Sequence, residues 1–356
     1  FPYNAWRKVT RATLMDDDKE MFLTGSPQGE PGLREAIRGY LHSARGVNCT
    51  ADQIIIGAGS EYLMMLLTQI LGTSRTIAME NPTYRQAYRV FESLGCQMKP
   101  VEMDAHGMNV RLLEESGADI AYVMPSHQYP MGVVMPVKRR QELLSWAGRG
   151  EKRYLIEDDY DSEFRYRGKP VPALQGMDIQ GKVIYMGTFS KSIAPAIRVG
   201  YLVLPAPLLA VYKRKCGFYA STVSRIDQKI IYQFLTEGHY ERHLNRMRAI
   251  YKGKHDVLMS ELKTLGTEFI VQGEYAGLHV LLKYRKAGME TWLVEEAAKA
   301  RVGGYGISGF LIAPLADQKE KCFSTVVLGY ARLNEDQIRE GIRRLAAAWK
   351  CSRPCP

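Results

Sequence analysis

The sequence predicts an α/β fold with a mostly parallel, seven-stranded sheet, helices on both faces of that sheet, and a smaller α+β C-terminal domain. Two patterns predict this fold. Between residues 54 and 204, short apolar runs alternate with helix-like segments, which is typical of a parallel sheet covered on both sides. Beyond Pro207, long helical segments replace this alternation and indicate a second block with its own core. A chain of 356 residues with 46% hydrophobic and 24% charged residues is long enough for both parts.

The N-terminal part of the chain leads into the sheet. Residues 1–34 are rich in proline and glycine, which predicts an irregular arm with a short helix before Asp16. Apolar residues between Leu33 and Leu41 recur at helical spacing, and Gly46 follows them as a helix stop. The expected strands of the sheet are Ile54–Ile56, Thr76–Met79, Met98–Val101, Ile120–Met124, Tyr154–Glu157, Val183–Met186 and Val199–Leu204.

The C-terminal block mixes long helices with fewer strands. The expected elements are helices at Asp227–Glu237, Tyr240–Leu262, Glu290–Arg301 and Glu335–Trp349, and strands at Gly277–Tyr284 and Ser324–Tyr330. We therefore divide the chain into an arm at 1–34 that packs with the small domain, a large domain at 35–240, and a small domain at 241–356.

The composition excludes several classes of protein. The net charge of +10 is spread along the chain without interleaved aromatic residues, so it indicates a solvated surface and not a nucleic-acid groove. The six cysteines lack paired metal spacing, so we predict reduced thiols and no metal site. No apolar run reaches about 18 residues and the N-terminus does not resemble a signal peptide, so we predict a cytoplasmic protein without a membrane partner.

Lys191 is the strongest candidate for a catalytic residue. The stretch Val183–Tyr201 runs from an apolar strand into small hydroxyl residues, this lysine and an arginine. Placing a lysine at the end of a buried strand costs free energy, so we expect its amine to have a chemical role. Forming an imine with an aldehyde cofactor is a common role for such an amine. Thr188, Ser190 and Arg198 suit a phosphate ester. Together these residues point to pyridoxal 5'-phosphate.

A glycine turn follows the first strand of the sheet. The sequence G-A-G-S-E-Y precedes an apolar helix, so a phosphate can bind the backbone N–H groups of Ala58, Gly59 and Ser60. A dinucleotide fingerprint is the rival interpretation, because Glu80 ends the next strand where a ribose-binding acid is expected. A turn with a purely structural role is a third.

Carboxylates follow the strand Tyr154–Glu157. Asp158 is placed to keep a pyridine nitrogen protonated, and Tyr160 to hydrogen-bond the ring hydroxyl. Taken alone, such an acidic cluster is more often a solvated loop, or a magnesium site in a phosphoryl-transfer enzyme, than a partner of a pyridine nitrogen. The position of Lys191 at the end of the following strand favours the cofactor.

Three further side chains are candidates: Tyr84 and His127 at the same edge of the sheet, and Arg332 at the end of a small-domain strand. Tyr84 can lie flat on a cofactor ring, although a core tyrosine would give the same pattern. His127 has no acid partner in the sequence, so we expect it to stack or hydrogen-bond near a ring and not to act as a base. Arg332 can grip a substrate carboxylate with two hydrogen bonds, or form a surface salt bridge.

Taken in sequence order, these candidate residues resemble those of fold-type I pyridoxal-phosphate aminotransferases, and the resemblance covers nearly the whole chain. Four strings are similar to the aminotransferase-like domain of MocR/GabR-type bacterial regulators, namely G-S-P-Q-G-E-P-G-L-R, P-S-H-Q-Y-P-M-G, I-E-D-D-Y-D-S-E-F-R-Y and Y-M-G-T-F-S-K. The resemblance implies a homodimer that holds the cofactor at Lys191 as an internal aldimine and senses an amino compound through an external aldimine. Members of that family carry an N-terminal winged helix-turn-helix domain. We expect that domain to be absent from this chain, which opens on Phe1, and we expect DNA contact only through it.

The sequence also departs from the resembling families. Tyr129 stands where ordinary aminotransferases have an asparagine that supports the ring hydroxyl, so we expect a sensor with little turnover and a tyrosine that contacts the ring or the effector. Thr24 stands where relatives commonly have a tyrosine that reaches the partner subunit's phosphate. Gln86 stands where regulators that bind γ-aminobutyrate have an arginine. We therefore expect a different effector, with its carboxylate on Arg332. A working aminotransferase is the alternative function, and a nicotinamide-dependent dehydrogenase is a distant third.

Overall fold

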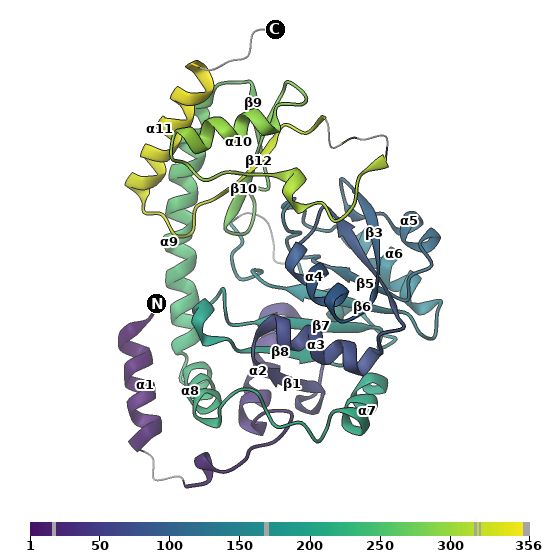
Figure 1. Cartoon of the computed structure of the whole chain (residues 1–356). Helices are drawn as coiled ribbons and strands as arrows, with labels where there is room; N and C mark the ends of the chain where they lie inside the picture. Colours follow the sequence, from purple (N-terminus) through teal and green to yellow (C-terminus); the bar gives the residue numbers. More distant parts are fainter. Residues whose placement is uncertain (16–18, 167–170, 317–318, 320–321, 352–356) are drawn as a thin grey trace.

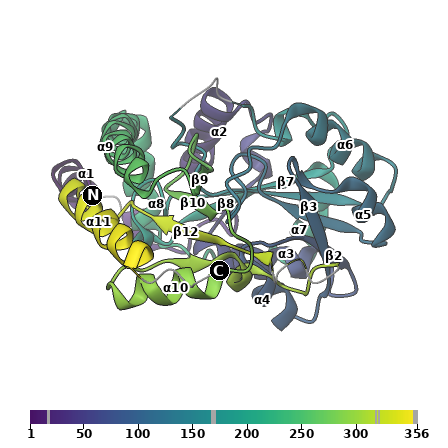
Figure 2. The same ribbon diagram turned by 90° about the horizontal axis from the view of Figure 1, so that it is seen from above.

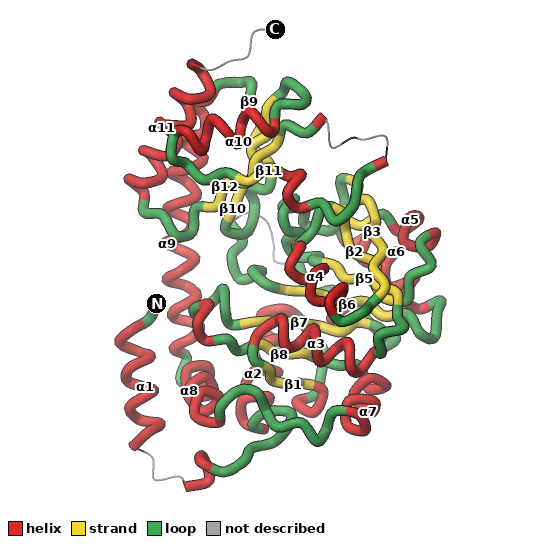
Figure 3. The backbone as a smooth tube through the Cα atoms, in the orientation of Figure 1, coloured by secondary structure: helices red, strands yellow, loops and turns green. Residues whose placement is uncertain are grey.

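The computed structural model describes residues 1–15, 19–166, 171–316, 319 and 322–351. Within these residues the chain forms two separate sheets, drawn in yellow in Figure 3. The larger sheet and its helices occupy the lower right of Figure 1, and the smaller sheet lies above it. No helix in the described ranges is both long and apolar enough to cross a membrane.

The large sheet has eight strands in the order β1-β8-β7-β6-β5-β2-β3-β4. Their bounds are β1 Ile54–Gly57, β2 Thr76–Asn81, β3 Gln97–Asp104, β4 Gly107–Met108, β5 Ile120–Val123, β6 Tyr154–Asp159, β7 Val183–Thr188 and β8 Gly200–Val203. The strands β3, β2, β5, β6 and β7 are parallel neighbours, whereas β8 runs antiparallel to both β1 and β7.

The predicted number of seven strands was therefore wrong by one. The additional strand, β4, pairs with the end of β3 through a register of Met103 with Met108. It has two residues. A segment that short follows a tight turn without an apolar run of its own, so the sequence carried no strand signal for it.

Helices cover both faces of the large sheet, as predicted. Their bounds are α2 Pro31–Arg45, α3 Gly59–Leu71, α4 Arg85–Ser93, α5 Val110–Glu115, α6 Val137–Gly148, α7 Ala206–Lys215 and α8 Arg225–Thr236. Because successive strand residues point to opposite faces, Ile184 packs with α3, α4 and α7, while Val183 and Tyr185 pack with the layer of α2, α5, α6 and α8.

The small domain is an antiparallel sheet covered by helices, which confirms the predicted α+β block. Its strands are β9 Phe269–Gln272, β10 His279–Tyr284, β11 Tyr305–Gly306 and β12 Thr325–Gly329, in the order β11-β12-β10-β9. Its helices are α9 His239–Leu262, α10 Glu290–Lys299 and α11 Glu335–Cys351. The long helix α9 runs from the large domain to the small sheet (Figure 1).

The N-terminal helix α1 (Tyr3–Met15) contacts α8, where the Trp6 ring lies 5.6 Å from that of Phe234. Figure 2 shows α1, α9 and α11 on one side of the molecule, and α5 and α6 on the other. Asp16 lies outside the described residues, and the domain limits stay a prediction. The 3₁₀ turns are Lys19–Phe22, Ala51–Gln53, Gln175–Met177, Pro195–Ile197, Lys263–Leu265 and Ile307–Phe310.

Candidate functional site

The strand register gathers the predicted residues at one edge of the large sheet. Gly200 of β8 pairs with Gly57 at the end of β1 and with Thr188 at the end of β7, so these three residues form one row. Strands β6 and β7 are parallel, with Asp158 opposite Met186. The loops that follow β1, β6 and β7 therefore leave the sheet on the same side, which is where open α/β sheets hold their ligands.

Lys191 lies in the turn between β7 and β8, and it is exposed. Its ammonium is one of the charges that act on His279 of β10. Burial, the nearby His127 and then Lys191 together lower the pKa of His279 to about 4, against the opposing effect of Asp161. The small-domain strand β10 thus brings a neutral imidazole close to the candidate lysine.

The glycine turn forms the N-terminus of α3, as predicted. Gly59 has φ +86, and a Cβ atom there would lie 2.6 Å from Nη2 of Arg198, so only glycine allows this approach. The backbone N–H of Ala58 donates to Oγ1 of Thr222 at 3.1 Å, a partner that the sequence did not indicate. Ser60 lies in the first turn of the same helix. The Arg198 guanidinium therefore lies directly against the glycine turn.

The two predicted hydroxyl residues also lie together. Oγ1 of Thr188 is 3.0 Å from Oγ of Ser190 and accepts from the Ser190 backbone N–H at 3.1 Å. Thr188 ends β7 in the row of Gly57 and Gly200, so both hydroxyls lie on the side of the glycine turn. The residues predicted to bind the phosphate are called the phosphate cradle below: Ala58, Gly59, Ser60, Thr188, Ser190 and Arg198.

Arg198 already has an ionic partner, Glu61, which the sequence reasoning missed. Nη2 of Arg198 donates to Oε2 of Glu61, and the two side chains are 50% and 36% exposed. Partial burial alone would raise the pKa of Glu61, but a backbone hydrogen bond and Arg198 outweigh it and lower that pKa. Glu61 is therefore an anion beside the cradle.

Asp158 is a buried carboxyl group at the end of β6, with 8% of its surface exposed. The hydroxyl of Tyr122 donates to its Oδ2. Burial raises the pKa of Asp158 to about 7; the Tyr122 hydrogen bond opposes this rise, and the charges of Asp159 and Asp161 add to it. No cation of the described residues is among these influences. Asp158 is therefore suited to a cationic partner that the described residues do not supply.

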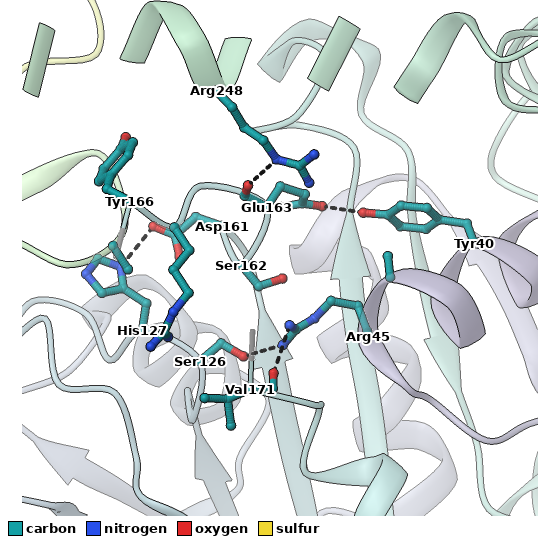
Figure 4. Close-up of a pocket in the computed structure, with 13 residues that line it drawn as sticks. Tyr40, Arg45, Ser126, His127, Asp161, Ser162, Glu163, Tyr166, Val171 and Arg248 are labelled. Atoms are coloured by element: carbon teal, nitrogen blue, oxygen red, sulfur yellow. Dashed lines mark hydrogen bonds and ion pairs between the residues drawn. The ribbon is translucent and has the colours of Figure 1, made fainter. Parts of the chain in front are cut away.

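His127 has an acid partner in the structure, contrary to what the sequence suggested. Its Nδ1 lies 3.0 Å from Oδ2 of Asp161, as the dashed line in Figure 4 marks, and 3.0 Å from the Tyr160 hydroxyl. One nitrogen cannot serve both groups equally, and a carboxylate is the stronger acceptor, so we assign the Nδ1–H to Asp161. Nε2 of His127 and Oδ1 of Asp161 are buried, and neither has a hydrogen-bond partner among the described residues.

Tyr84 and Tyr129 belong to an aromatic wall. The Tyr129 ring makes edge contacts with Tyr84, Tyr160, His279 and Phe310 at centroid distances of 6.2, 6.3, 5.1 and 5.4 Å. Burial raises the pKa of Tyr84, and the charges of Glu61 and Asp158 raise it further. Tyr84 is therefore close enough to both Glu61 and Asp158 for their charges to act on it.

Arg332 is not gathered with these residues. It is exposed after β12, and no described contact joins its side chain to the residues around Lys191. The neighbouring Ala331 carbonyl accepts from Nζ of Lys254 at 2.8 Å, which ties this turn to α9. Thr24 and Gln86 are also exposed. A role of Arg332 in binding a carboxylate stays a prediction.

Most residues that the sequence reasoning missed come from elsewhere in the chain. Asp161 was visible as part of the acidic string after β6, although nothing in the string paired it with His127. His279 and Phe310 belong to the small domain and carry no motif, so only the tertiary structure brings them to Tyr129. In the described part of the chain, no group of three or more His, Cys, Asp or Glu side chains is arranged to hold a metal ion.

The residues present fit pyridoxal 5'-phosphate. A buried acid without a cationic partner suits the protonated ring nitrogen, and the glycine turn with Arg198 suits the phosphate. The exposed amine of Lys191 lies at the same edge of the sheet. Tyr160 lies near Asp158, and its hydroxyl, 3.0 Å from Nδ1 of His127, would suit a ring oxygen of the cofactor.

Comparison with known proteins agrees with this geometry. Residues 2–315 match the family described as aminotransferase class I and II. The crystal structure of the multiple substrate aminotransferase from Thermococcus profundus superposes with a TM-score of 0.85, at 26% identity, over 98% of this chain and 88% of that one. These matches confirm the predicted fold class and the predicted cofactor.

Two curated relatives are transcriptional regulators. The uncharacterized HTH-type regulator YdeL of Bacillus subtilis is 39% identical over 98% of this chain and 74% of its own length. The probable rhizopine catabolism regulatory protein MocR of Rhizobium meliloti is 30% identical over 98% of this chain and 70% of its own length. The resemblance to MocR-type regulators is thereby confirmed.

Proposed function

Because the chain belongs to the aminotransferase class I and II family and, within it, to the MocR-type regulators, we propose that it is the effector-binding part of a transcriptional regulator. In this proposal Lys191 holds pyridoxal 5'-phosphate, and an amino compound, such as an amino acid, is sensed by displacing that lysine. The observation that carries the proposal is Asp158, a buried carboxyl whose pKa is raised by burial and on which no cation of the described residues acts.

Each part of the site has a separate task in this proposal. Pyridoxal 5'-phosphate, when bound, supplies an aldehyde that condenses with a primary amine and releases water. Arg198 and the α3 N-terminus hold the phosphate, Asp158 keeps the ring nitrogen protonated, and Tyr84 covers the ring. An effector amine competes with Lys191 for the aldehyde, while the Tyr129 and Phe310 rings exclude water.

The signal in this proposal is a change in the position of the small domain. His279 of β10 hydrogen-bonds the Pro130 carbonyl through Nε2 at 2.9 Å, and the Thr83 backbone N–H donates to the Phe310 carbonyl at 3.1 Å. These contacts join the small domain to loops of the large domain at the site. Release of Lys191 next to His279 changes the surroundings of these contacts. The equilibrium between positions of the small domain then shifts.

The proposal is tested by absorbance and by mass measurement. We expect the purified protein to show an absorbance band near the visible edge that shifts when one amino acid of a panel is added. Borohydride reduction then fixes the cofactor mass on the peptide that contains Lys191. The variant Lys191→Ala loses this mass, and Lys213→Ala on the exposed side of α7 retains it. Covalent attachment that persists in Lys191→Ala overturns the proposal.

A second candidate function is transamination. Lys191, Asp158 and Tyr160 are the residues that such an enzyme would use, and the chain resembles the Thermococcus profundus multiple substrate aminotransferase along 98% of its length. In that case the freed amine of Lys191 carries a proton between two carbon atoms. Incubation with amino donors and a keto acid separates the two functions, because many turnovers per site contradict a sensor without catalysis.

We also propose a homodimer. The neighbouring residues Phe22 and Leu23 expose 72% and 65% of their surfaces, and large apolar side chains exposed next to one another suit a surface that a partner covers. Light scattering after gel filtration tests this proposal: we expect twice the chain mass for the purified protein. The double variant Phe22→Ser/Leu23→Ser should shift it toward the monomer, and a monomeric parent protein contradicts the proposal.

A further inference from the structure

The turn that carries Lys191 is held by helix α9 on both sides of the lysine. Two residues before Lys191, the Phe189 ring lies 5.6 Å from that of Tyr240. One residue after it, the Ser192 carbonyl accepts from Nε2 of His243 at 3.0 Å. Tyr240 and His243 are three positions apart and therefore lie on the same face of the helix. One face of α9 thus contacts the chain on either side of the lysine.

The contact between Ser192 and His243 is shielded from water. The two residues expose 2% and 7% of their surfaces, whereas the neighbouring Lys191 is exposed. The turn itself is closed by the Ile193 backbone N–H, which donates to the Phe189 carbonyl at 2.8 Å. A buried hydrogen bond is expensive to leave unmade, because the unpaired group has lost its water without gaining a partner. The exposed amine is therefore carried by a turn whose position depends on a buried contact.

His243 is a neutral donor in this contact. Because a carbonyl oxygen only accepts hydrogen bonds, the hydrogen atom of the imidazole lies on Nε2. Burial lowers the pKa of His243; the hydrogen bond to Ser192 opposes this effect, and the charge of Arg246 adds to it. Among the described residues, the bond to the Ser192 carbonyl is the one hydrogen bond of this side chain. The imidazole therefore has a single partner, the residue next to Lys191.

Helix α9 also reaches the small domain. Its 24 residues span about 36 Å at 1.5 Å per residue. Leu258 and Leu262 near its end belong to the core of the small domain, and Nζ of Lys254 donates to the Ala331 carbonyl after β12 at 2.8 Å. Figure 1 shows the helix passing from the large domain to the small sheet. One continuous helix thus joins the turn of Lys191 to the small domain.

We propose that His243 is a positioning residue for Lys191, which fixes the turn so that the amine meets the cofactor aldehyde, and which connects the state of that amine to α9. This inference rests on the proposed function, because it assumes that Lys191 holds pyridoxal 5'-phosphate. The amine and the aldehyde condense with release of one water molecule, and such a step is favoured when both groups are held within reach.

The hydrogen bond from His243 restricts the turn before the covalent bond forms, so less freedom is lost when Lys191 binds the aldehyde. When an effector amine displaces Lys191, the turn is no longer anchored through the cofactor. Helix α9 is then the element that contacts the released turn. The same hydrogen bond therefore serves both attachment of the cofactor and the change of position of the small domain.

Two substitutions of His243 separate the hydrogen bond from the packing. His243→Leu removes the donor and keeps an apolar side chain near the Phe234 ring, which lies 6.5 Å from the imidazole. His243→Gln keeps an N–H donor at about the place of Nε2. His255→Leu is the matched control, because His255 is also buried on α9, with 4% exposed, but its ring stacks on Tyr166 at 4.8 Å.

Calorimetric titration of the cofactor-free protein with two probes measures the effect. Pyridoxal 5'-phosphate carries the aldehyde that Lys191 binds, whereas pyridoxine 5'-phosphate has an alcohol in its place and binds without a covalent bond. We expect His243→Leu to weaken binding of the first probe by about tenfold, as for loss of one buried hydrogen bond, and to leave the second unchanged. His243→Gln and His255→Leu should bind both probes like the parent protein.

Three results overturn the proposal. Equal weakening of both probes in His243→Leu assigns the residue a purely structural role. Unchanged affinity of His243→Leu for pyridoxal 5'-phosphate shows that the turn does not depend on the hydrogen bond. A His243→Gln protein that binds as weakly as His243→Leu shows that the donor is not the cause.

Hydrogen exchange of the cofactor-free protein separates this inference from the proposed function. Exchange of the Ile193 N–H should be faster in His243→Leu than in the parent protein or in His255→Leu, whether or not Lys191 binds a cofactor. If Lys191→Ala retains a covalent cofactor, the proposed function fails, while faster exchange at Ile193 still supports the hold of His243 on the turn. Unchanged exchange at Ile193 overturns that hold.

The link to α9 has its own measurement. In the loaded parent protein, the amino acid that shifts the absorbance band should also change hydrogen exchange in residues 239–247 of α9. His243→Leu should lose this change, and His255→Leu should retain it. A change that persists in His243→Leu overturns the link between Lys191 and the helix.

Discussion

His127 and Asp161 form a buried pair in which Nδ1 of the histidine lies 3.0 Å from Oδ2 of the aspartate, with 1% and 2% of the side chains exposed. The pair connects two polar regions of the molecule, because Tyr160 lies on one side of it and a cavity lined by Arg45 and Arg248 on the other. Its strength therefore affects both the stability of the fold and the state of the tyrosine.

We expect Asp161→Asn to lower the free energy of unfolding by about 1–3 kcal/mol, because it removes a charged acceptor from a buried imidazole. The control is Asp256→Asn, since His255 and Asp256 form a similar pair at 3.4 Å in which the aspartate is 64% exposed. That change should alter stability by less than about 0.5 kcal/mol. Urea unfolding measures both, and an unchanged stability of Asp161→Asn contradicts the importance assigned to the pair.

Glu61→Gln should tighten cofactor binding by about threefold, because it removes a negative charge beside the phosphate cradle and frees Arg198. The gain is modest since the Arg198–Glu61 pair is half exposed. It should shrink in high salt. Fluorescence titration with pyridoxal 5'-phosphate measures it, and the exposed Glu92→Gln on α4 serves as control. Weaker binding by Glu61→Gln shows instead that Glu61 positions the arginine.

Glu80 should make stability depend on pH. Burial raises the pKa of Glu80 from 4.5 to about 7, and hydrogen bonds from Gln128 and Met108 offset this only in part. A group whose pKa is raised by folding stabilises the native state at low pH, and this stabilisation is lost as the pH rises through about 7. The advantage of Glu80→Gln over the parent protein should therefore be larger at pH 8 than at pH 5, by about 2 kcal/mol.

Thermal unfolding at the two pH values tests the effect of Glu80. Glu115→Gln, at an exposed position of α5, should behave like the parent at both. A Glu80→Gln protein whose advantage does not change with pH contradicts a raised pKa for this carboxyl group.

Gly277→Ala should be more harmful than Gly266→Ala. Both glycines have positive φ values, +77 and +85, so both substitutions add backbone strain of about 1 kcal/mol. A Cβ at Gly277 would also lie 1.9 Å from Cε1 of His127, whereas a Cβ at Gly266 meets nothing within 4 Å. We expect an additional cost of about 2 kcal/mol for Gly277→Ala. Equal destabilisation of the two variants in urea contradicts the close approach to His127.

Much of the fold was predictable from the sequence, because the strands β1, β2, β5, β6, β7 and β8 are buried, largely apolar runs, although β3 buries only Val101. The runs before Gly57, Asp158 and Thr188 are followed by the polar residues of the site, so those residues were predictable as well. The strands β4 and β11 have two residues each, and β9 alternates between half-buried and exposed positions. The two-residue strands are too short to carry a pattern, and the apolar part of β9, Phe269–Val271, is shorter than the runs of four or more residues that indicate a strand.

The partners of the site residues were not predictable in the same way. Glu61 is next to the predicted turn, yet its ion pair with Arg198 depends on how β8 returns beside β1. His279 reaches His127 and Tyr129 only because the small domain lies over the edge of the large sheet. Such contacts depend on tertiary packing, and no local spacing in the sequence predicts them.

The antiparallel strand β8 has a consequence for the order of events during protein synthesis. Gly57 and Thr188 form one row only through Gly200, so neither end of the phosphate cradle is in place until β8 has emerged from the ribosome. A nascent chain that ends before Val203 can form parallel strands and helices, but it cannot capture the cofactor. Cofactor loading is therefore a late step of biosynthesis, which follows the completion of the central sheet.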